Sequence, residues 1–249
     1  MELLYEGKAK KIFATKNPTE VRLHFKDEAT AFDGTKKSVF ADKGRVNCYI
    51  SSHLLHQLNK NGVPTHFIRQ LTTNEQLCHS VDIIPIEVVV RNVTAGSICR
   101  RFGVEEGKKL NKPMVEFFYK SDELHDPPMS RTHALEFGWA EQWEMSYMKH
   151  AALAVNEFLC EFWDRLGITL VDFKLEFGRT VGGQLLLADE ITPDGCRLWE
   201  KGTRRSLDKD VFRKDSADLS TTYRELLQRV LAGDSGTDPD YLWRVWGDQ

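Results

Sequence analysis

The stretch LVDFKLEFG, residues 170–178, places three charged side chains on one face of a predicted β-strand. Asp172, Lys174 and Glu176 alternate with apolar residues, and a period of two is typical of a half-buried strand. The apolar face is expected to hold Val171, Phe173, Leu175 and Phe177. A strand at the surface could carry such a charged face simply because water solvates it. The alternative is that the charged face lines a site for charged ligands.

The next segment, RTVGGQLLLADEITPDG, is predicted to fold back on this strand as a hairpin. Gly182 and Gly183 suit the positive φ angles of a two-residue turn, and with that turn Glu176 lies directly opposite Asp189. Like charges at facing positions destabilise a strand pair by up to ~1 kcal/mol, so an exposed sheet has no reason to keep them. Two carboxylates, completed by phosphates and water, are a usual way to hold Mg²⁺. We therefore predict a magnesium site at Glu176 and Asp189.

The N-terminal segment YEGKAKKIF combines a glycine with several lysines. Gly7 lies between two predicted strands, and Lys8 and Lys10 follow it. Such a hairpin can bring backbone N–H groups close to phosphates while lysines neutralise their charge. The segment matches neither the Walker loop nor the kinase glycine loop. A solvated lysine-rich hairpin is therefore the alternative interpretation.

Three further segments carry arginines that could bind anions. In IPIEVVVRNVTAGS, an apolar strand ends at Arg91, and Ser97 begins a short helix. A guanidinium group offers two parallel donors to a phosphate or carboxylate, although Arg91 in a salt bridge beside a capped helix would explain the same pattern. Arg197 lies in ITPDGCRLW, just beyond the predicted hairpin, and LDKDVFR supplies Asp210 and Arg213.

The composition indicates a globular protein without nucleic-acid or membrane partners. Of the 249 residues, 41% are hydrophobic and 29% are charged, with a net charge of −3, so a general nucleic-acid binder is not expected. No apolar run approaches the ~18 residues of a membrane span, and the N-terminus lacks the organisation of a signal peptide. Five scattered cysteines fit neither a zinc site nor a disulfide framework. Reduced thiols and a cytoplasmic location are expected.

Helices and strands are predicted to follow each other without a regular βαβ rhythm, so we expect an α+β fold. Residues 1–90 look β-rich, with a hairpin at the N-terminus and one helix in KGRVNCYISSHLLHQLNKNG. Residues 91–249 are expected to form a second part that carries the metal and substrate sites. Its main helix should run from Glu141 to Leu166. Near the C-terminus, Trp243 and Trp246 could dock on the body or on a second subunit.

Taken together, these segments resemble the SAICAR synthetase family. The two longest matches are IPIEVVVRNVTAGS and LVDFKLEFG. Shorter segments that follow the family in order are YEGKAKKIF, FYKSDELHDP, LADEITPDGCRLW and LDKDVFR. The resemblance extends from residue 3 to about residue 230.

The resemblance implies an ATP-dependent ligase of de novo purine biosynthesis. Such an enzyme joins carboxyaminoimidazole ribonucleotide (CAIR) to L-aspartate and gives SAICAR, ADP and phosphate, through an acyl phosphate in our hypothesis. The implied fold has two α+β parts with antiparallel sheets and an ATP cleft between them. The N-terminal part would resemble the small lobe of protein kinases. CAIR, L-aspartate and ATP with Mg²⁺ would be the small-molecule partners, and a second copy of the chain would complete a homodimer.

The resemblance also suggests a role for each of the residues above. Lys174 and Asp172 would be catalytic, with Asp172 as a possible base for the aspartate amine. Glu176 and Asp189 would hold Mg²⁺ and so contribute to ATP binding. The other expected ATP contacts are Lys8, Lys10, Val88 and Lys120. The ribonucleotide or aspartate would be bound by Arg91, Ser97, Arg197, Asp210 and Arg213.

Two other classes of protein remain as alternatives. A kinase would share the nucleotide cleft and the two acidic residues, but the chain has neither an HRD-type loop nor a DFG segment. A regulator that binds nucleotide without catalysis is the other class. The presence of Lys174, Glu176 and Asp189 argues against it.

Overall fold

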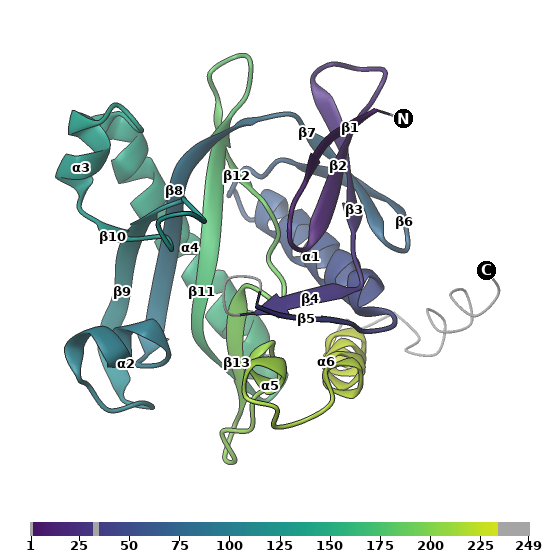
Figure 1. Cartoon of the computed structure of the whole chain (residues 1–249), viewed down its shortest axis with the longest axis vertical. Coiled ribbons are helices and arrows are strands. Elements are labelled where there is room, and N and C mark those ends of the chain that lie inside the picture. Colours follow the sequence, from purple (N-terminus) through teal and green to yellow (C-terminus); the bar gives the residue numbers. More distant parts are fainter. Residues whose placement is uncertain (1, 32–34, 234–249) are drawn as a thin grey trace.

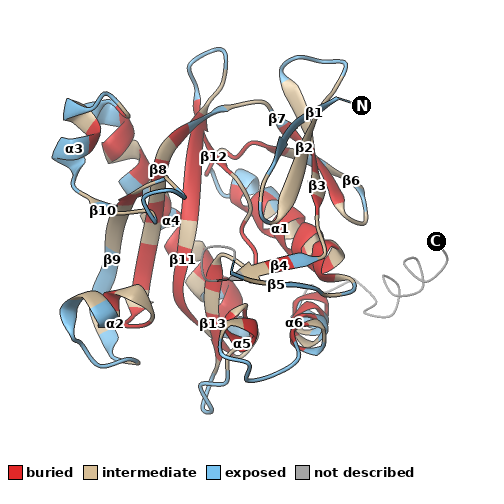
Figure 2. Cartoon of the chain, viewed as in Figure 1, coloured by how far each residue is buried: buried red, intermediate tan, exposed pale blue. Residues whose placement is uncertain are grey.

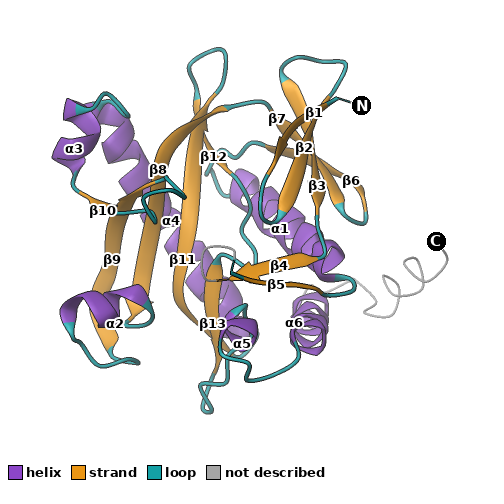
Figure 3. Cartoon of the chain, in the orientation of Figure 1, coloured by secondary structure: helices purple, strands orange, loops and turns teal. Residues whose placement is uncertain are grey.

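The computed structural model describes residues 2–31 and 35–233, and these form two large antiparallel sheets, a separate hairpin and several helices (Figure 1). Helices and strands are mixed without βαβ alternation (Figure 3). The predicted α+β class with antiparallel sheets is therefore confirmed. Trp243 and Trp246 lie outside the described residues.

A five-stranded sheet forms the N-terminal part, with α1 packed against one face. The strand order is β1-β2-β3-β7-β6. Buried leucines and isoleucine at helical spacing, among them Ile50, Leu54 and Leu58, join α1 to this sheet. The elements are β1 (Leu3–Glu6), β2 (Lys10–Ala14), β3 (Glu20–Phe25), β6 (Phe67–Thr72), β7 (Glu75–His79) and α1 (Lys43–Lys60). A separate hairpin consists of β4 (Glu28–Ala31) and β5 (Lys36–Val39).

The second sheet has the order β10-β9-β8-β11-β12, and β13 also pairs with β11. Its strands are β8 (Asp82–Val93), β9 (Lys109–Tyr119), β10 (Pro128–Met129), β11 (Ile168–Arg179), β12 (Leu185–Ala188) and β13 (Cys196–Glu200). The helices are α2 (Ser97–Phe102), α3 (Arg131–Glu136), α4 (Gln142–Arg165), α5 (Asp210–Arg213) and α6 (Leu219–Gly233). The face of α4 that is directed at β8 and β11 is buried (Figure 2). One hydrophobic core runs through both sheets.

Long, strongly periodic segments folded as predicted. The helices expected in KGRVNCYISSHLLHQLNKNG and from Glu141 to Leu166 are α1 and α4. The change from one sheet to the other falls between His79 and Asp82. The predicted boundary at residue 90 therefore cuts through β8, whose apolar alternation continues past that point.

The predicted register between β11 and β12 is wrong by one residue. Glu176 faces Ala188, not Asp189. The loop is closed by Thr180, whose N–H donates to the carbonyl of Gln184 (2.9 Å), so the turn is longer than the predicted Gly182-Gly183 pair. Asp189 lies just past the ladder, with a positive φ of 62°.

The apolar face of β11 also differs from the prediction at one residue. The pairing with β13 shifts between Leu170 and Asp172, as expected for a bulge. As a result, Val171 packs in a small second cluster with Val93, Ala95 and Trp199, while Phe173 and the later apolar residues face the main core.

A buried ion pair fastens the N-terminal part to the loop that follows β12. The ammonium of Lys43, at the start of α1, lies 2.6 Å from Asp194 Oδ2. The hydroxyl of Tyr223, on α6, donates to Asp194 Oδ1 (2.5 Å). Burial opposes ionisation of Asp194, but Lys43 and Lys209 hold its pKa well below its usual range. Three separate elements are therefore joined at one carboxylate.

Replacing Lys43 with Met should lower the free energy of unfolding by about 3–5 kcal/mol, because it leaves the Asp194 carboxylate buried without its cation. The loss should be largest above the unfolded-state pKa of Asp194, since a carboxylate with a depressed pKa stabilises the fold there and loses that contribution as the pH falls. Chemical denaturation at pH 7.5 and at low pH measures both effects. The matched control is Lys60→Met, at the exposed end of the same helix. A loss equal to that of the control would contradict the assignment.

Candidate active site

The charged face of β11 lies against a matching face of β8. Asp172 faces Arg91, and Glu176 faces Glu87. Lys174 faces Val89, so the charged residues of both strands share one side of the sheet. The like-charged pair predicted from the sequence, Glu176 with Asp189, is therefore not formed across the ladder, and Glu87 of β8 is the acidic residue directly opposite Glu176.

A cavity of about 930 Å³ lies between the two sheets and is lined by this charged face. Walls come from β1 to β3, from the connection between β7 and β8, and from β8, β11 and the residues after β12. Six of the predicted nucleotide and catalytic residues line it, namely Lys8, Lys10, Lys120, Lys174, Glu176 and Asp189. Residues far apart in the sequence are thus brought to one cavity.

Val88, which was predicted to contact ATP, does not line this cavity. Along β8 the side chains alternate, and Val88 belongs to the face that is fully buried in the main core. The cavity is lined instead by Ile83 and Glu87, on the other face of β8, and by Val81, which precedes this strand. An apolar run shows that a strand is buried but not which of its residues face a ligand.

Lys174 lies at the centre of the acidic groups. Its Nζ is 2.5 Å from Glu176 Oε1, 2.9 Å from Glu87 Oε1 and 3.8 Å from Asp189 Oδ2. Burial would lower the pKa of Lys174, but the three carboxylates raise it well above its usual value. The same ammonium thus holds Glu176 and Asp189 close together, although they do not face each other in the ladder.

Three other lysines contact acidic groups of the cavity from different elements. Lys10 pairs with Asp189 and with Glu190. Lys120 pairs with Glu176, and Lys8 Nζ lies 2.7 Å from Asp122 Oδ1. Burial opposes the ionisation of Asp189, but Lys10, Lys174 and Lys120 hold its pKa well below its usual range. The carboxylate of Asp189 therefore carries its charge while it is paired with these lysines.

The donor set fits magnesium better than a metal with an all-protein coordination shell. Within residues 2–31 and 35–233, no three His, Cys, Asp or Glu side chains form a ready metal centre. Glu176 and Asp189 instead offer two carboxylates beside several lysines, and Mg²⁺ typically takes its other ligands from phosphates and water. The residues present are thus suited to Mg²⁺ bound together with a phosphorylated ligand.

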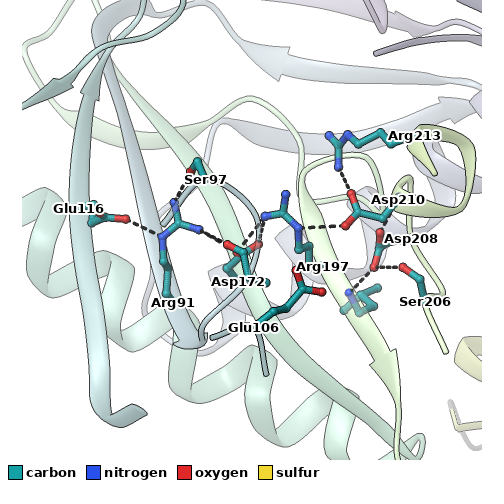
Figure 4. A network of polar contacts seen from close by, with 12 residues as sticks. Arg91, Ser97, Glu106, Glu116, Asp172, Arg197, Ser206, Asp208, Asp210 and Arg213 are labelled. Carbon is teal, nitrogen blue, oxygen red and sulfur yellow. Dashed lines mark hydrogen bonds and ion pairs between the residues drawn. The ribbon is translucent and has the colours of Figure 1, made fainter. Parts of the chain in front are cut away.

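A second cluster of charged groups continues along β11 from the cavity (Figure 4). Asp172 is buried, and Arg91 Nη1 and Arg197 Nη1 both donate to its Oδ2 (2.9 Å each). Arg91 also donates to Ser97 Oγ (3.1 Å) and contacts Glu116. Burial raises the pKa of Asp172 despite the two arginines. The predicted residues Arg91, Ser97, Asp172 and Arg197 therefore form one group.

The last two predicted residues extend this cluster from α5. Arg197 Nε donates to Asp210 Oδ2 (3.1 Å), and Arg213 Nη1 donates to Asp210 Oδ1 (2.6 Å). Burial opposes ionisation of Asp210, but Arg197 and Arg213 lower its pKa. Gly96 leaves room for the Arg197 guanidinium, because an added Cβ would lie 2.5 Å from Nη2. Gly96 also has a positive φ of 64°.

Several residues of the site carried no signal that we could interpret in the sequence. Glu87 lies in an apolar run, and its partner on β11 becomes known only from the strand order. Asp208 accepts hydrogen bonds from the N–H groups of Leu198 and Asp210 (2.7 Å each) and so holds β13 next to α5. His66 lines the cavity from a segment that is distant in the sequence.

None of the helices in the described ranges is both long and apolar enough to cross a membrane.

Comparison with known proteins identifies the family. A family model described as SAICAR synthetase matches residues 3–230. The phosphoribosylaminoimidazole-succinocarboxamide synthase of Shouchella clausii is 52% identical over 229 residues, covering 92% of this chain and 96% of that protein. The crystal structure of the same synthase from Ehrlichia chaffeensis has a TM-score of 0.90 at 47% identity, covering 92% of this chain and 98% of that chain. A SAICAR synthetase in complex with ADP has a TM-score of 0.89 at 46% identity, covering 92% of this chain and 97% of that chain. This chain therefore belongs to the SAICAR synthetase family.

Proposed function

We propose that this protein joins CAIR to L-aspartate at the expense of ATP and gives SAICAR, ADP and phosphate. The observation that carries the proposal is the order of charged groups along β11. The lysine–carboxylate cavity reaches Lys174 and Glu176, and the arginine cluster begins at Asp172. Same-face neighbours on a strand are ~7 Å apart, so a phosphate donor and an anionic acceptor would bind side by side. The name of the curated relatives and the ADP complex of a structural neighbour support this assignment.

The nucleotide would bind in the cavity between the sheets. Its apolar wall, which includes Ile12, Val21 and Ile83, would pack against the adenine base. Lys8, Lys10 and Lys120 would exchange their present carboxylate partners for phosphate oxygens, since each ends in an ammonium group at the cavity. Glu176 and Asp189 would hold Mg²⁺, which neutralises developing charge on the phosphates when it is bound.

The ribonucleotide would bind at the arginine cluster. Arg91 and Arg197 present planar donors of the kind that bind phosphate and carboxylate, with Ser97 beside them. Both carboxylate oxygens of Asp172 accept hydrogen bonds from arginines. This geometry supports a positioning role for Asp172 rather than the role of base. Asp210 and Arg213 would fix Arg197 in turn.

The reaction requires positive charge because all of the reactants are anions. A carboxylate resists attack by an amine because oxide is a poor leaving group, and phosphorylation to an acyl phosphate replaces it with phosphate. Lys174 would stabilise the charge on the transferring group, since it lies between the two ends of the site. The likeness to a kinase small lobe, the homodimer and the cytoplasmic location remain predictions.

Release of ADP should require both CAIR and L-aspartate. In a coupled assay with ATP and Mg²⁺, we expect turnover with both substrates, and the formation of one SAICAR for each ADP. Withholding aspartate should abolish steady-state ADP release, because the acyl phosphate then has no amine to react with. Continuous ADP release at an unchanged rate without aspartate would identify a kinase or phosphatase and contradict the proposal.

Replacing Glu87 with Gln should become more favourable to stability, relative to wild type, as the pH rises. Burial raises the pKa of Glu87, although Lys174 acts in the opposite direction. A carboxyl group whose pKa is raised in the folded state loses its stabilising contribution as the pH rises through that pKa. The Tm of the variant, relative to wild type, should therefore increase between pH 4 and pH 8. The control Glu123→Gln removes the same charge at an exposed position and should show no such trend. An unchanged Tm difference across this range would contradict the role of burial.

A further inference from the structure

Asp208 lies between strand β13 and helix α5, next to the arginine cluster (Figure 4). Its side chain is fully buried. The Oδ2 atom accepts hydrogen bonds from the N–H of Leu198 (2.7 Å) and from the hydroxyl of Ser206 (2.9 Å). The Oδ1 atom accepts a hydrogen bond from the N–H of Asp210 (2.7 Å). The two oxygens of one carboxylate are therefore bound to two different elements, β13 and α5.

The same two elements carry the two ends of the contact between Arg197 and Asp210. Leu198 directly follows Arg197 on β13, and Asp210 is the first residue of α5. Arg197 Nε donates to Asp210 Oδ2 at 3.1 Å, so this contact requires a fixed distance between the strand and the helix. The Asp208 carboxylate joins the two backbones directly at this point. The carbonyl of Leu198 also accepts a hydrogen bond from the N–H of Leu207 (2.8 Å), which holds the strand to the segment that leads into α5.

A residue that only closed the turn before α5 would not need to be an aspartate. Asn and Asp both accept a hydrogen bond from the backbone N–H two residues further on. A carboxylate, however, offers two acceptor oxygens, whereas the amide of Asn has one acceptor oxygen and one NH₂ donor. Burial raises the pKa of Asp208 to about 7, and the charge of Asp210 acts in the same direction. A buried carboxylate that uses both of its oxygens thus indicates a role beyond the turn itself.

We propose that Asp208 is a positioning residue for the ribonucleotide site, in which its carboxylate sets the distance between Arg197 and Asp210 and so orients the Arg197 guanidinium towards CAIR. This inference rests on the proposed function, because it assumes that Arg197 binds the ribonucleotide. Asp208 does not line the cavity between the sheets, and both of its oxygens accept hydrogen bonds from the protein. It therefore acts on the substrate through Arg197.

The test is steady-state kinetics of Asp208→Asn at pH 8.5, where the carboxylate of the wild type is ionised. The amide has the same shape, but its NH₂ group must face one of the two backbone N–H groups, so only one of the two elements stays bound. The KM for CAIR should rise roughly tenfold or more, because the Arg197 guanidinium is displaced. The KM for ATP should be unchanged, since Lys174 and its carboxylates are held by contacts of their own.

Ser206→Ala is the matched control. It removes a donor to the same carboxylate but leaves both backbone hydrogen bonds of Asp208 in place, so its KM for CAIR should equal that of the wild type. A loss of folded protein would lower the apparent kcat and leave both KM values unchanged. A selective rise in the KM for CAIR therefore separates positioning from a loss of stability.

The inference is overturned, while the proposed function stands, if Asp208→Asn has the wild-type KM for CAIR or raises the KM for CAIR and for ATP by the same factor. An equal rise in the KM for CAIR in Ser206→Ala would overturn it as well. If the wild-type protein makes no SAICAR from CAIR, aspartate and ATP, the proposed function fails and the inference fails with it. If Asp208→Asn does not fold, Asp208→Ser takes its place with the same outcomes, because a serine can close the same turn but has a single oxygen that cannot reach both N–H groups.

Discussion

The arrangement of this protein depends on keeping several buried charges next to one another on the two central strands of a sheet. Strands β8 and β11 direct one face into the hydrophobic core and the other into the cavity between the sheets. A buried charge is tolerated only when it is paired and hydrogen-bonded. Lys174 meets this condition for Glu87, Glu176 and Asp189 together. The rest of the fold brings the other cations to the same place.

The lysines that surround these carboxylates come from segments that are far apart in the sequence, and no local sequence pattern shows that they meet. Lys10 belongs to the N-terminal hairpin and Lys120 follows β9, yet both reach the acidic groups beside Lys174. Their contacts with carboxylates balance the charge of the cavity. Binding of magnesium with a triphosphate would replace them by lysine–phosphate and magnesium–carboxylate contacts of the same kind.

The distance between successive same-face residues of β11 also bears on where the proposed substrates would lie relative to each other. Glu176, Lys174 and Asp172 are successive same-face residues of β11, and each step is ~7 Å. The first belongs to the nucleotide side and the last to the arginine cluster. Because the pleat is rigid, the distance between the proposed positions of the phosphate donor and its acceptor would be fixed by the backbone rather than by flexible loops. Asp189 is the exception, since it lies beyond the ladder, and its carboxylate is held by ion pairs with Lys10 and Lys174.

Much of this site could be predicted from the sequence because its residues lie in long regular segments. The alternation in LVDFKLEFG identified Asp172, Lys174 and Glu176, and the segment that returns from the hairpin supplied Asp189. The errors concerned the register between β11 and β12 and the side of β8 on which a residue lies. A loop one residue longer than expected moved the partner of Glu176 to Ala188, and Val88 proved to face the core. Glu87 and His66 could not be found, because only the strand order and the contact between sheets bring them to the cavity.

The most direct measurement is a crystal structure of the protein with ADP and Mn²⁺, in which anomalous scattering locates the metal. The expected result is one Mn²⁺ bonded to carboxylate oxygens of both Glu176 and Asp189 and to phosphate oxygens of ADP, with Lys10 and Lys120 moved from the carboxylates to the phosphates. A metal that is bound to neither carboxylate, or a nucleotide outside the cavity between the sheets, would contradict the proposed role of the charged face of β11.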